Sequence, residues 1–321
     1  MTATRPPTDS NRIAIIGAGH VGATAAYALM LRALFREIVL IDSNTALAEA
    51  EAADISDANA LARPARIWAG DYADTSDACI AVITAGGVTH GAQTRLSVAA
   101  ESAAIVSACV DSLVSHGFAG VLVVSANPVD LMTLVAARRS GLPPAQVIGT
   151  GTLLDTSRLK QTLAQSLDVA PGSIEGLVLG EHGDSEVAAF STVRIGGQTL
   201  DQVSVGQPVL DRTVVGCQVR DAGYAIVKGK GYTSYGVATA IVRICEAIVR
   251  DERAVLPVST LLSGQYGVSD LCFSLPCVLG AGGIRRVLTP DLDPVEATGL
   301  AASAKVLGEA FATLSAAHSA S

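Results

Sequence analysis

The sequence predicts an α/β protein in two parts: an N-terminal, doubly wound parallel sheet and a C-terminal domain of α+β character. Three observations predict this class. Half of the 321 residues are hydrophobic but only 4% are aromatic, so the core must consist mainly of Ala, Val, Leu and Ile, as in parallel strands and their covering helices. From residue 12 short β-branched runs alternate with Ala-rich helical stretches, and after residue 151 this alternation stops.

The first domain is expected over residues 11–150. Strands are predicted at RIAIIG, EIVLID, ARIWAG, CIAVITAG, GVLVVSAN and QVIGT, and helices at HVGATAAYALMLRA, SNTALAEAEAADISDA and residues 98–115. Strands that alternate with helices of this length form right-handed crossovers, which place neighbouring strands parallel.

The second domain is expected over residues 151–321. A helix at DTSRLKQTLAQSL leads to a strand at IEGLVLG and a hairpin at EVAAFSTVRIGGQTL, in which Gly196 and Gly197 supply the positive φ of a tight turn. Helices are predicted over residues 209–228, 233–250 and 294–317, with strand-like runs at AVLPVSTLL and LCFSLPCVL. This mixed order is typical of an α+β domain.

Composition and charge restrict the partners and the compartment. A formal net charge of -8, without a run of Lys and Arg, argues against binding to nucleic acid. The six cysteines are scattered and form no C-x-x-C pair, which favours reduced thiols over disulfides or a metal site. The first residues lack the apolar stretch of a signal peptide, and a charge, Pro or Asn interrupts every long apolar window. A cytoplasmic protein outside the membrane is therefore expected.

The turn GAGHVG has the context that a dinucleotide-binding motif requires. It follows a strand and opens a helix: Gly17 permits the tight turn, Gly19 lets the backbone approach a pyrophosphate, and Gly22 lets the helix pack closely. Asp42 ends the next strand, where a carboxylate accepts hydrogen bonds from a ribose and repels a 2′-phosphate. A Rossmann-type domain that binds NAD is predicted, although Asp42 as a simple helix cap is the alternative, and His20 is interpreted as a solvent-facing loop residue.

Chemistry is predicted at the stretch GEHGDSEV. His182 follows a buried strand, and an imidazole titrates near neutrality, so it is the candidate proton donor and acceptor. Asp155 is the candidate for orienting its ring, and Arg158, three residues further on the same helix face, suits a substrate carboxylate. Taken singly, a packing histidine and an ordinary helical ion pair remain the alternatives.

Taken together, the motifs resemble a known family. GAGHVG, IVLID, TAGGVTHGAQTRL, SANPVD, GTGTLLDTSRL, GEHGDSEV, KGYTSYGVA, VSTLLSGQYGV and GIRRVL occur in the order and spacing of the L-lactate and malate dehydrogenase family, over residues 11–317. The resemblance implies an NAD-dependent enzyme in which His182 is the acid/base catalyst, Asp155 orients it, and Arg158 binds the substrate carboxylate.

The same resemblance implies roles for further residues. Arg95 would polarise the substrate carbonyl as the Gly-containing loop over residues 87–93 closes, and Asn127 and Thr233 would contact the substrate. Alternatively, Asn127 only stabilises the turn before Pro128. Further cofactor-binding residues implied by the resemblance are Val21, Gly86, Gly87, Ser125 and Asn127.

The expected reaction is hydride transfer from NADH to C2 of a 2-oxo acid while His182 donates a proton, which gives the L-hydroxy acid reversibly. L-Lactate dehydrogenase is the leading hypothesis. An enzyme for bulkier, branched or aromatic 2-oxo acids is the alternative, followed by malate dehydrogenase. A non-catalytic NAD-binding structural protein is the alternative from another class.

Two departures from the family pattern affect specificity and regulation. Thr89 stands where lactate dehydrogenases have Gln and malate dehydrogenases have Arg; a neutral, short side chain disfavours a second carboxylate and leaves room for a bulkier substrate. His90 could reach an acidic substrate, but a solvated loop residue is the simpler interpretation. Lys160 and Glu175 replace an Arg and a His that bind fructose 1,6-bisphosphate in many bacterial relatives, so no such activation is expected. The resemblance also implies a homo-oligomer, either a tetramer or a dimer.

Overall fold

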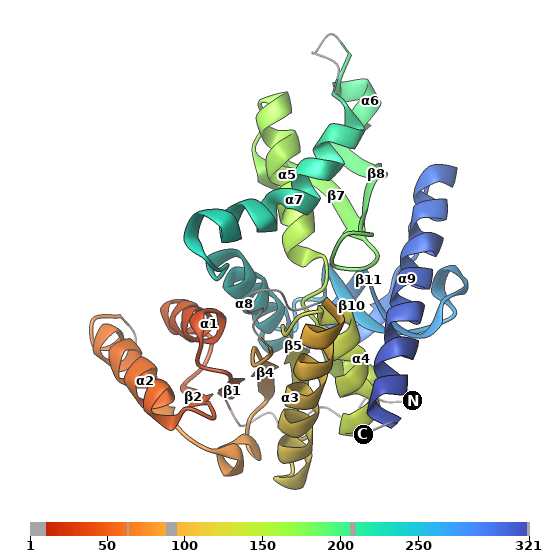
Figure 1. Ribbon diagram of the computed structural model, residues 1–321. Coiled ribbons are helices and arrows are strands. Elements are labelled where there is room, and N and C mark those ends of the chain that lie inside the picture. The colour runs from red at the N-terminus through yellow and green to blue at the C-terminus, as the bar shows by residue number, and fades with distance from the viewer. Residues whose placement is uncertain (1–10, 63, 88–94, 206–209, 320–321) are drawn as a thin grey trace.

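The computed structural model describes residues 11–62, 64–87, 95–205 and 210–319, with the side chains of residues 95–97 and 316–319 excepted (Figure 1). Its α/β architecture confirms the predicted fold class. The alternation of strands and helices over the first 150 residues forms the larger part of the body of the molecule.

A nine-stranded sheet runs through the body in the order β12-β11-β10-β6-β5-β4-β1-β2-β3. Six strands are parallel: β1 (Arg12–Ile16), β2 (Glu37–Ile41), β3 (Arg66–Ala69), β4 (Ile80–Ile83), β5 (Val121–Val124) and β6 (Val147–Gly149). All six were predicted. The chain order reverses between β4 and β1, which is where ligands bind in open sheets of this kind.

Three antiparallel strands extend this sheet; the sequence predicted strand-like runs for two of them, β10 and β11, but neither β12 nor their addition to the parallel sheet. The three strands are β10 (Ala254–Ser263), β11 (Ser269–Gly280) and β12 (Gly283–Val287), and β10 lies beside β6 with Ser259 opposite Gly149. Gly149 permits this approach, since a Cβ there would lie 2.9 Å from that of Ser259. Strands assigned by the sequence to two domains therefore share one sheet.

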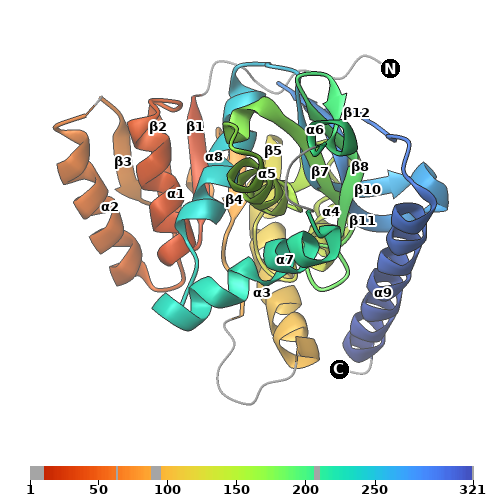
Figure 2. The same ribbon diagram turned by 90° about the horizontal axis from the view of Figure 1, so that it is seen from above.

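Helices cover both faces of the sheet (Figures 1 and 2). One face carries α1 (His20–Leu31), α2 (Thr45–Asn59) and α8 (Tyr235–Val249), and the other carries α3 (Arg95–Ser115), α4 (Val129–Ser140) and α9 (Pro294–Ser319). Alternation along β1 serves both layers, because Ile13 and Ile15 join the first core and Ala14 and Ile16 the second. Helix α4, which follows Pro128, was not predicted.

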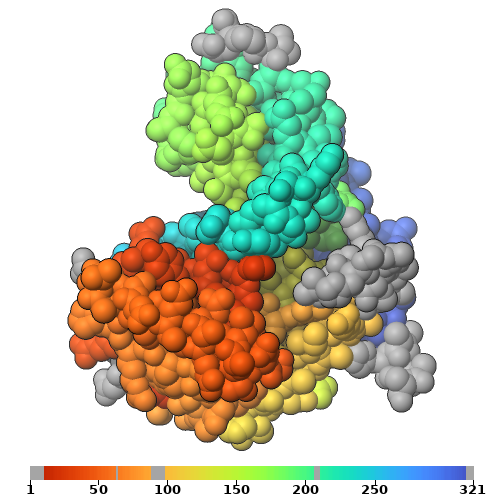
Figure 3. All heavy atoms as spheres, turned by 60° about the vertical axis from the view of Figure 1, so that its left-hand side comes forward, coloured from red at the N-terminus to blue at the C-terminus, as the bar shows by residue number. Residues whose placement is uncertain are grey.

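A second, smaller lobe stands above the body in Figure 3. It contains α5 (Leu153–Leu167), β7 (Ile174–Leu179), β8 (Val187–Ile195), β9 (Gln198–Thr199), α6 (Leu200–Val203) and α7 (Arg212–Lys230), around a core of its own. The predicted hairpin joins β8 to β9, with φ of 57° at Gly196 and 82° at Gly197. Single 3₁₀ turns occur at Tyr72–Thr75, Pro144–Gln146, Pro171–Ser173 and Gln265–Gly267.

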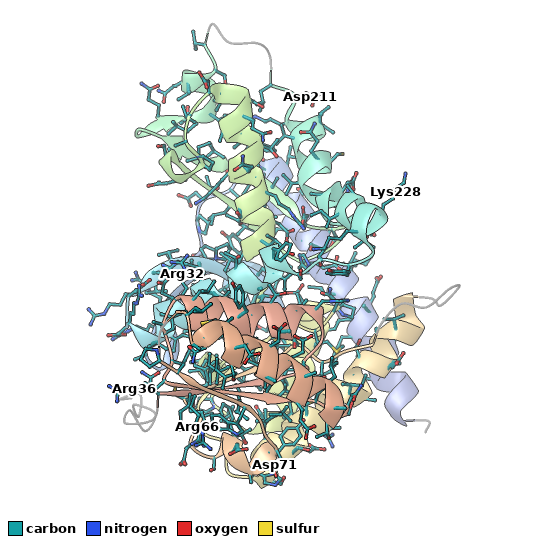
Figure 4. All side chains as sticks on the ribbon, turned by 90° about the vertical axis from the view of Figure 1, so that its left-hand side faces the viewer. Arg32, Arg36, Arg66, Asp71, Asp211 and Lys228 are labelled. Carbon is teal, nitrogen blue, oxygen red and sulfur yellow. The ribbon has the colours of Figure 1, made fainter. Side chains whose placement is uncertain are left out.

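Helix α7 connects the lobe to the body, and Asp211 and Lys228 mark its two ends in Figure 4. Asp211 caps the helix, because its carboxylate accepts the backbone N–H groups of Thr213 and Val214. Lys228 lies in the last turn, where a cation complements the helix dipole. After α7 the chain turns at Gly231 and enters α8.

One segment of α3, Val98–Ser115, is long and apolar enough to cross a membrane by length and composition alone. The segment includes Glu101 and Asp111, and its side chains Val106 and Val110 are buried against the sheet. A core helix meets the same criteria, and that is how α3 packs here. All six cysteines are free thiols.

Candidate active site

The glycine turn lies at the carboxyl edge of the sheet, between β1 and α1. Gly17 has φ of 104°, which an L side chain rarely adopts, and a Cβ at Gly22 would lie 1.8 Å from the carbonyl oxygen of Gly17. A Cβ at Gly19, in contrast, would meet nothing within 4 Å. Gly19 is also the N-cap of α1 and provides no side-chain cap. The turn thus leaves space and backbone donors for a phosphate group.

Asp42 braces this turn from the end of β2. Its Oδ2 accepts a hydrogen bond from the backbone N–H of Ala18 at 2.7 Å, and its Oδ1 accepts one from Asn44 at 2.8 Å. The N-cap of α2 is Asn44, whose side chain accepts the N–H of Leu47. Asp42 is therefore not the N-cap of α2, which was the alternative interpretation. Its side chain contacts the glycine turn instead.

The ends of β4 and β5 lie along the same carboxyl edge of the sheet and carry further predicted cofactor residues. Gly86 and Gly87 follow β4, and the N–H of Gly87 donates to Ser102 Oγ at 3.1 Å. Ser125 follows β5, and its hydroxyl is buried without a hydrogen-bond partner in the described ranges. An open turn and an unpartnered hydroxyl along one edge fit a dinucleotide. Val21 lies half-buried in the first turn of α1.

Asn127 lies exposed at the same edge, at the end of the segment that follows β5. The peptide bond between Asn127 and Pro128 is cis, and Pro128 is the N-cap of α4. The residue therefore lies in the turn before Pro128 and at the carboxyl edge, so the two interpretations of Asn127 are compatible.

The structure brings together His182, Asp155 and Arg158. Nδ1 of His182 lies 2.5 Å from Asp155 Oδ2, and Nη1 of Arg158 donates to Asp155 Oδ1 at 2.8 Å. The side chain of Asp155 is 1% exposed, against 28% for His182 and 16% for Arg158. A buried carboxylate thus contacts both the imidazole and the guanidinium, and no hydrogen bond of His182 Nε2 is found among the described residues.

The N-terminal end of α5 fixes this geometry. Thr152, the N-cap of α5, donates through its hydroxyl to the carbonyl of Val178, and the hydroxyl of Thr156 accepts the N–H of Val178 at 2.9 Å. These bonds attach β7 to the helix that carries Asp155. Because His182 lies three residues beyond the end of β7, this attachment places its ring beside Asp155.

A second buried carboxylate holds the His182 backbone. The N–H of His182 donates to Asp130 Oδ2 at 2.7 Å, and Ser274 Oγ lies 3.4 Å from Asp130 Oδ1. Ser274 also pairs with Gly180 by two backbone hydrogen bonds of 3.0 Å. The loop is therefore fixed from α4 and from β11.

Burial and charge set the proton affinities here. Burial by itself lowers the pKa of His182, but the charge and hydrogen bond of Asp155 outweigh it and raise that pKa to about 9. Burial acts to raise the pKa of Asp155, yet His182 and Arg158 together hold it below its usual value. Burial raises the pKa of Asp130 to about 6. The imidazole is thus protonated, and ready to donate, at neutral pH.

A third carboxylate, Glu186, completes the surroundings of His182. Ligand atoms of Asp155, His182 and Glu186 all lie within 4.8 Å of one another. Burial, and next the charge of Asp155, raise the pKa of Glu186 to about 8. Because both oxygens of Asp155 are already bonded to cationic side chains, we interpret this cluster as a set of proton-sharing groups rather than a metal site.

Some predicted site residues lie outside the described part of the chain. These are Thr89 and His90, together with the other residues of 88–94. Arg95 begins α3, but its side chain is likewise outside the description. Thr233 is described, and lies half-buried between α7 and α8.

His20 is exposed to solvent, as its interpretation requires, but it begins a helix and does not lie in a loop. It is the first residue of α1, and its exposed ring stacks on Tyr232, with centroids 3.8 Å apart and planes inclined by 10°. Both rings line a cavity of about 390 Å³ together with Glu51, Asp54 and Tyr235. The stack joins the helix that follows the glycine turn to the segment that carries Thr233.

Sequence reasoning missed Asp130, Glu186 and Ser274. Asp130 and Glu186 stand inside the quoted motifs SANPVD and GEHGDSEV, so their acidic type next to other site residues was an available signal. Ser274 lies in the run LCFSLPCVL and carries no comparable signal, because only the pairing of β11 with Gly180 brings it to the site.

Comparisons with known proteins all point to one family. Residues 11–149 match the model of the lactate/malate dehydrogenase NAD-binding domain, and residues 152–317 match that of the α/β C-terminal domain. The L-lactate dehydrogenase of Allorhizobium ampelinum is 42% identical over 300 residues, which is 92% of this chain and 97% of that protein. L-lactate dehydrogenase 1 of Bacillus cereus is 40% identical over 308 residues, covering 94% and 98% of the two chains.

Solved structures are similar over almost the whole chain. The minor L-lactate dehydrogenase of Enterococcus mundtii in its ligands-bound form superposes with a TM-score of 0.92 at 37% identity, covering 95% of this chain and 98% of that one. MGS-M5, a lactate dehydrogenase from a deep-sea metagenome library of the Medee basin, gives a TM-score of 0.92 at 35% identity, with 97% and 100% coverage.

Proposed function

The chain belongs to the lactate/malate dehydrogenase family, and we propose that it interconverts pyruvate and L-lactate. Family membership makes it an NAD-dependent dehydrogenase that acts on the CH–OH group of a 2-hydroxy acid. The observation that carries the proposal is the contact of one buried carboxylate, Asp155, with both His182 and Arg158. The names of the relatives support L-lactate as the hydroxy acid.

The proposed mechanism assigns each of these side chains one task. When bound, the nicotinamide supplies or accepts the hydride at C2 of the substrate. The guanidinium of Arg158 binds the substrate carboxylate by paired hydrogen bonds. Nε2 of protonated His182 donates the proton to the carbonyl oxygen, and in the reverse direction takes it from the hydroxyl.

Asp155 serves both partners in this scheme. Its hydrogen bond to Nδ1 keeps the proton-donating nitrogen of His182 directed at the substrate, and its charge stabilises the imidazolium. Its second oxygen holds Arg158 in position. We assign polarisation of the carbonyl to Arg95 and contacts with substrate to Asn127 and Thr233, on the resemblance alone.

The choice of 2-oxo acid depends in this proposal on Thr89. A neutral side chain disfavours the second carboxylate of oxaloacetate, since an unpaired buried charge costs several kcal/mol. The test is the oxidation of NADH with pyruvate, 2-oxobutyrate, 2-oxoisocaproate, phenylpyruvate and oxaloacetate, compared as kcat/KM. Pyruvate is expected to lead. If a branched or aromatic 2-oxo acid has the highest kcat/KM, that acid is the preferred substrate and pyruvate is not. If oxaloacetate has the highest kcat/KM, the role of Thr89 is contradicted.

We further propose a cytoplasmic homo-oligomer, a tetramer or a dimer, that fructose 1,6-bisphosphate does not activate. Exposed apolar side chains along α7, at Val214, Tyr224, Ile226 and Val227, favour a subunit contact. Light scattering after size exclusion would give the oligomeric state. The sugar bisphosphate is expected to leave the KM for pyruvate unchanged, because Glu175 would repel it.

A further inference from the structure

The three carboxylates around His182 differ in how they are bonded. Asp155 gives its two oxygens to His182 and Arg158, and Asp130 accepts the backbone N–H of His182. Glu186 differs, because its Oε1 is buried and has no hydrogen-bond partner in the described part of the chain. An ionised oxygen in that position has lost its hydration without replacement.

The loop that carries Glu186 is fixed by contacts on its other side. The carboxylate of Glu181 accepts the hydroxyl of Ser185, and the N–H of Glu181 donates to Ser303 of α9 at 3.0 Å. The N–H of Glu186 itself donates to the carbonyl of Gly183 at 3.2 Å. Glu186 thus belongs to a short turn held to α9, so its carboxyl group stays within the cluster that it forms with Asp155 and His182.

Charged side chains from three segments, α5, α7 and its own loop, influence the ionisation of Glu186. Asp155 on α5 opposes its ionisation, whereas His182 in its own loop, Arg158 on α5 and Arg220 on α7 favour it. Arg158 is also the group assigned to the substrate carboxylate. When a second anion pairs with that guanidinium, less of its charge remains to offset an ionised Glu186.

We propose that Glu186 is a second proton-binding group of the substrate pocket, which must be neutral when the 2-oxo acid is bound. Binding of the oxo acid above neutral pH then transfers one proton from solvent to the Glu186 carboxylate, in addition to the proton that His182 holds. This inference rests on the proposed function, since it requires a substrate carboxylate at Arg158. Glu186 acts through the charges of Arg158 and His182 and takes no part in hydride transfer.

The two protons are separable because they belong to different groups. Glu186, with a pKa raised to about 8, and His182, with a pKa raised to about 9, both lose protons as the pH approaches 10. A pocket with one titrating group takes up at most one proton per ligand, whereas a pocket with two takes up more than one.

The experiment measures proton uptake when oxamate, an unreactive isostere of pyruvate, binds to the NADH-saturated protein. Calorimetric titrations at pH 8 to 10 in two buffers of different ionisation enthalpy give the number of protons. We expect more than one proton per oxamate at pH 9 to 10 for the wild type and at most one for Glu186→Gln. Glu175→Gln, which removes an exposed carboxylate of β7, is the matched control and should behave as the wild type.

The dissociation constant of oxamate provides a second readout. Above pH 9 its logarithm should rise with pH toward a slope of two for the wild type, and toward one for Glu186→Gln. Uptake that never exceeds one proton in the wild type would overturn the inference while the proposed function stands. So would uptake above one proton that persists in Glu186→Gln. No binding of oxamate at any pH would instead overturn the proposed function, and this inference with it.

Discussion

At the scale of single residues, one imidazole is surrounded by carboxylates that each act on a different part of it. Asp155 bonds to the ring, Asp130 bonds to the backbone N–H, and Glu186 lies beside Asp155 and His182, with its Oε1 unpartnered in the described ranges. The arrangement favours the protonated ring, which is the form that donates a proton to a carbonyl oxygen.

Removing the imidazole of His182 should greatly lower the rate of pyruvate reduction and should hardly change the affinity for NADH. His182→Asn is expected to lower kcat for pyruvate reduction by about 10²- to 10⁴-fold, the usual contribution of a general acid. Binding of NADH, measured by fluorescence titration, should change by less than about threefold, because the proposed cofactor residues follow β1, β2, β4 and β5. His116→Asn, at an exposed position just after α3, is the control. An equal loss in both variants would contradict the assignment.

Asp130 is expected to act on the proton affinity of His182 through its charge. In Asp130→Asn the side-chain oxygen can still accept the His182 N–H, but the negative charge that raises the pKa of His182 is gone. The alkaline limb of the pH profile of kcat/KM for pyruvate should therefore move to lower pH, by about half a unit or more. A purely structural role would lower kcat/KM without moving that limb.

Glu186 should make stability depend on pH in a defined direction. Its pKa is raised in the folded protein to about 8, so its stabilising contribution is complete below the unfolded value near 4.5 and is lost as the pH rises through about 8. Glu186→Gln removes this loss. The free energy of unfolding of the variant, relative to that of the wild type, should therefore be higher at pH 9 than at pH 5 by on the order of 2 kcal/mol. Chemical denaturation of both proteins at the two pH values measures this. The same difference in free energy of unfolding at pH 5 and at pH 9 would refute the prediction.

At the scale of elements, the site depends on segments that are held by their neighbours. Thr152 and Thr156 attach β7 to α5, and the pairing of Gly180 with Ser274 attaches the His182 loop to β11. On the cofactor side, Asp42 at the end of β2 holds the glycine turn that begins α1. The His182 loop and the glycine turn therefore lie on short segments between rigid elements, where sites of open α/β sheets usually form.

The His20–Tyr232 stack is expected to join the two sides of the site. His20 begins the helix after the phosphate turn, and Tyr232 precedes Thr233. His20→Ala should raise the KM for pyruvate by about three- to tenfold, because an aromatic pair contributes about 0.5–1.5 kcal/mol. His20→Phe keeps a ring and should restore most of the effect. Tyr27→Ala, further along the same face of α1, is the control. An equal rise in KM in Tyr27→Ala would mean that the stack is not the cause.

At the scale of the whole molecule, the shared sheet joins both halves of the sequence in one body. Strand β10 continues the sheet beyond β6, and α8, from the second half of the sequence, covers α1, with Ala238 and Ile241 fully buried there. The parallel half alone would leave these apolar surfaces open to water.

The two halves should therefore unfold together. Trp68, the sole tryptophan, lies in β3 and reports on the parallel half, whereas far-ultraviolet circular dichroism reports on all helices. Thermal or urea unfolding followed by both signals should give coincident transitions. A clearly earlier loss of the circular dichroism signal would mean that the lobe and the antiparallel strands unfold separately.

The sequence by itself determined the class of fold, the six parallel strands, the glycine turn with Asp42, and the candidates His182, Asp155 and Arg158. These features were readable because each depends on local pattern: β-branched runs, glycine spacing, and two residues three positions apart on one helix. The hairpin at Gly196 and Gly197 was predictable for the same reason.

The tertiary structure alone decided what surrounds the imidazole and how the two halves join. Asp130 meets His182 across 52 positions of the chain, Ser274 reaches the site through β11, and His20 stacks on a residue of the second half. No local pattern encodes such contacts, because they arise when packing brings distant segments together. The same packing buries Glu186 beside Asp155 and His182, and burial, which a sequence does not show, is what raises the proton affinity of that carboxylate.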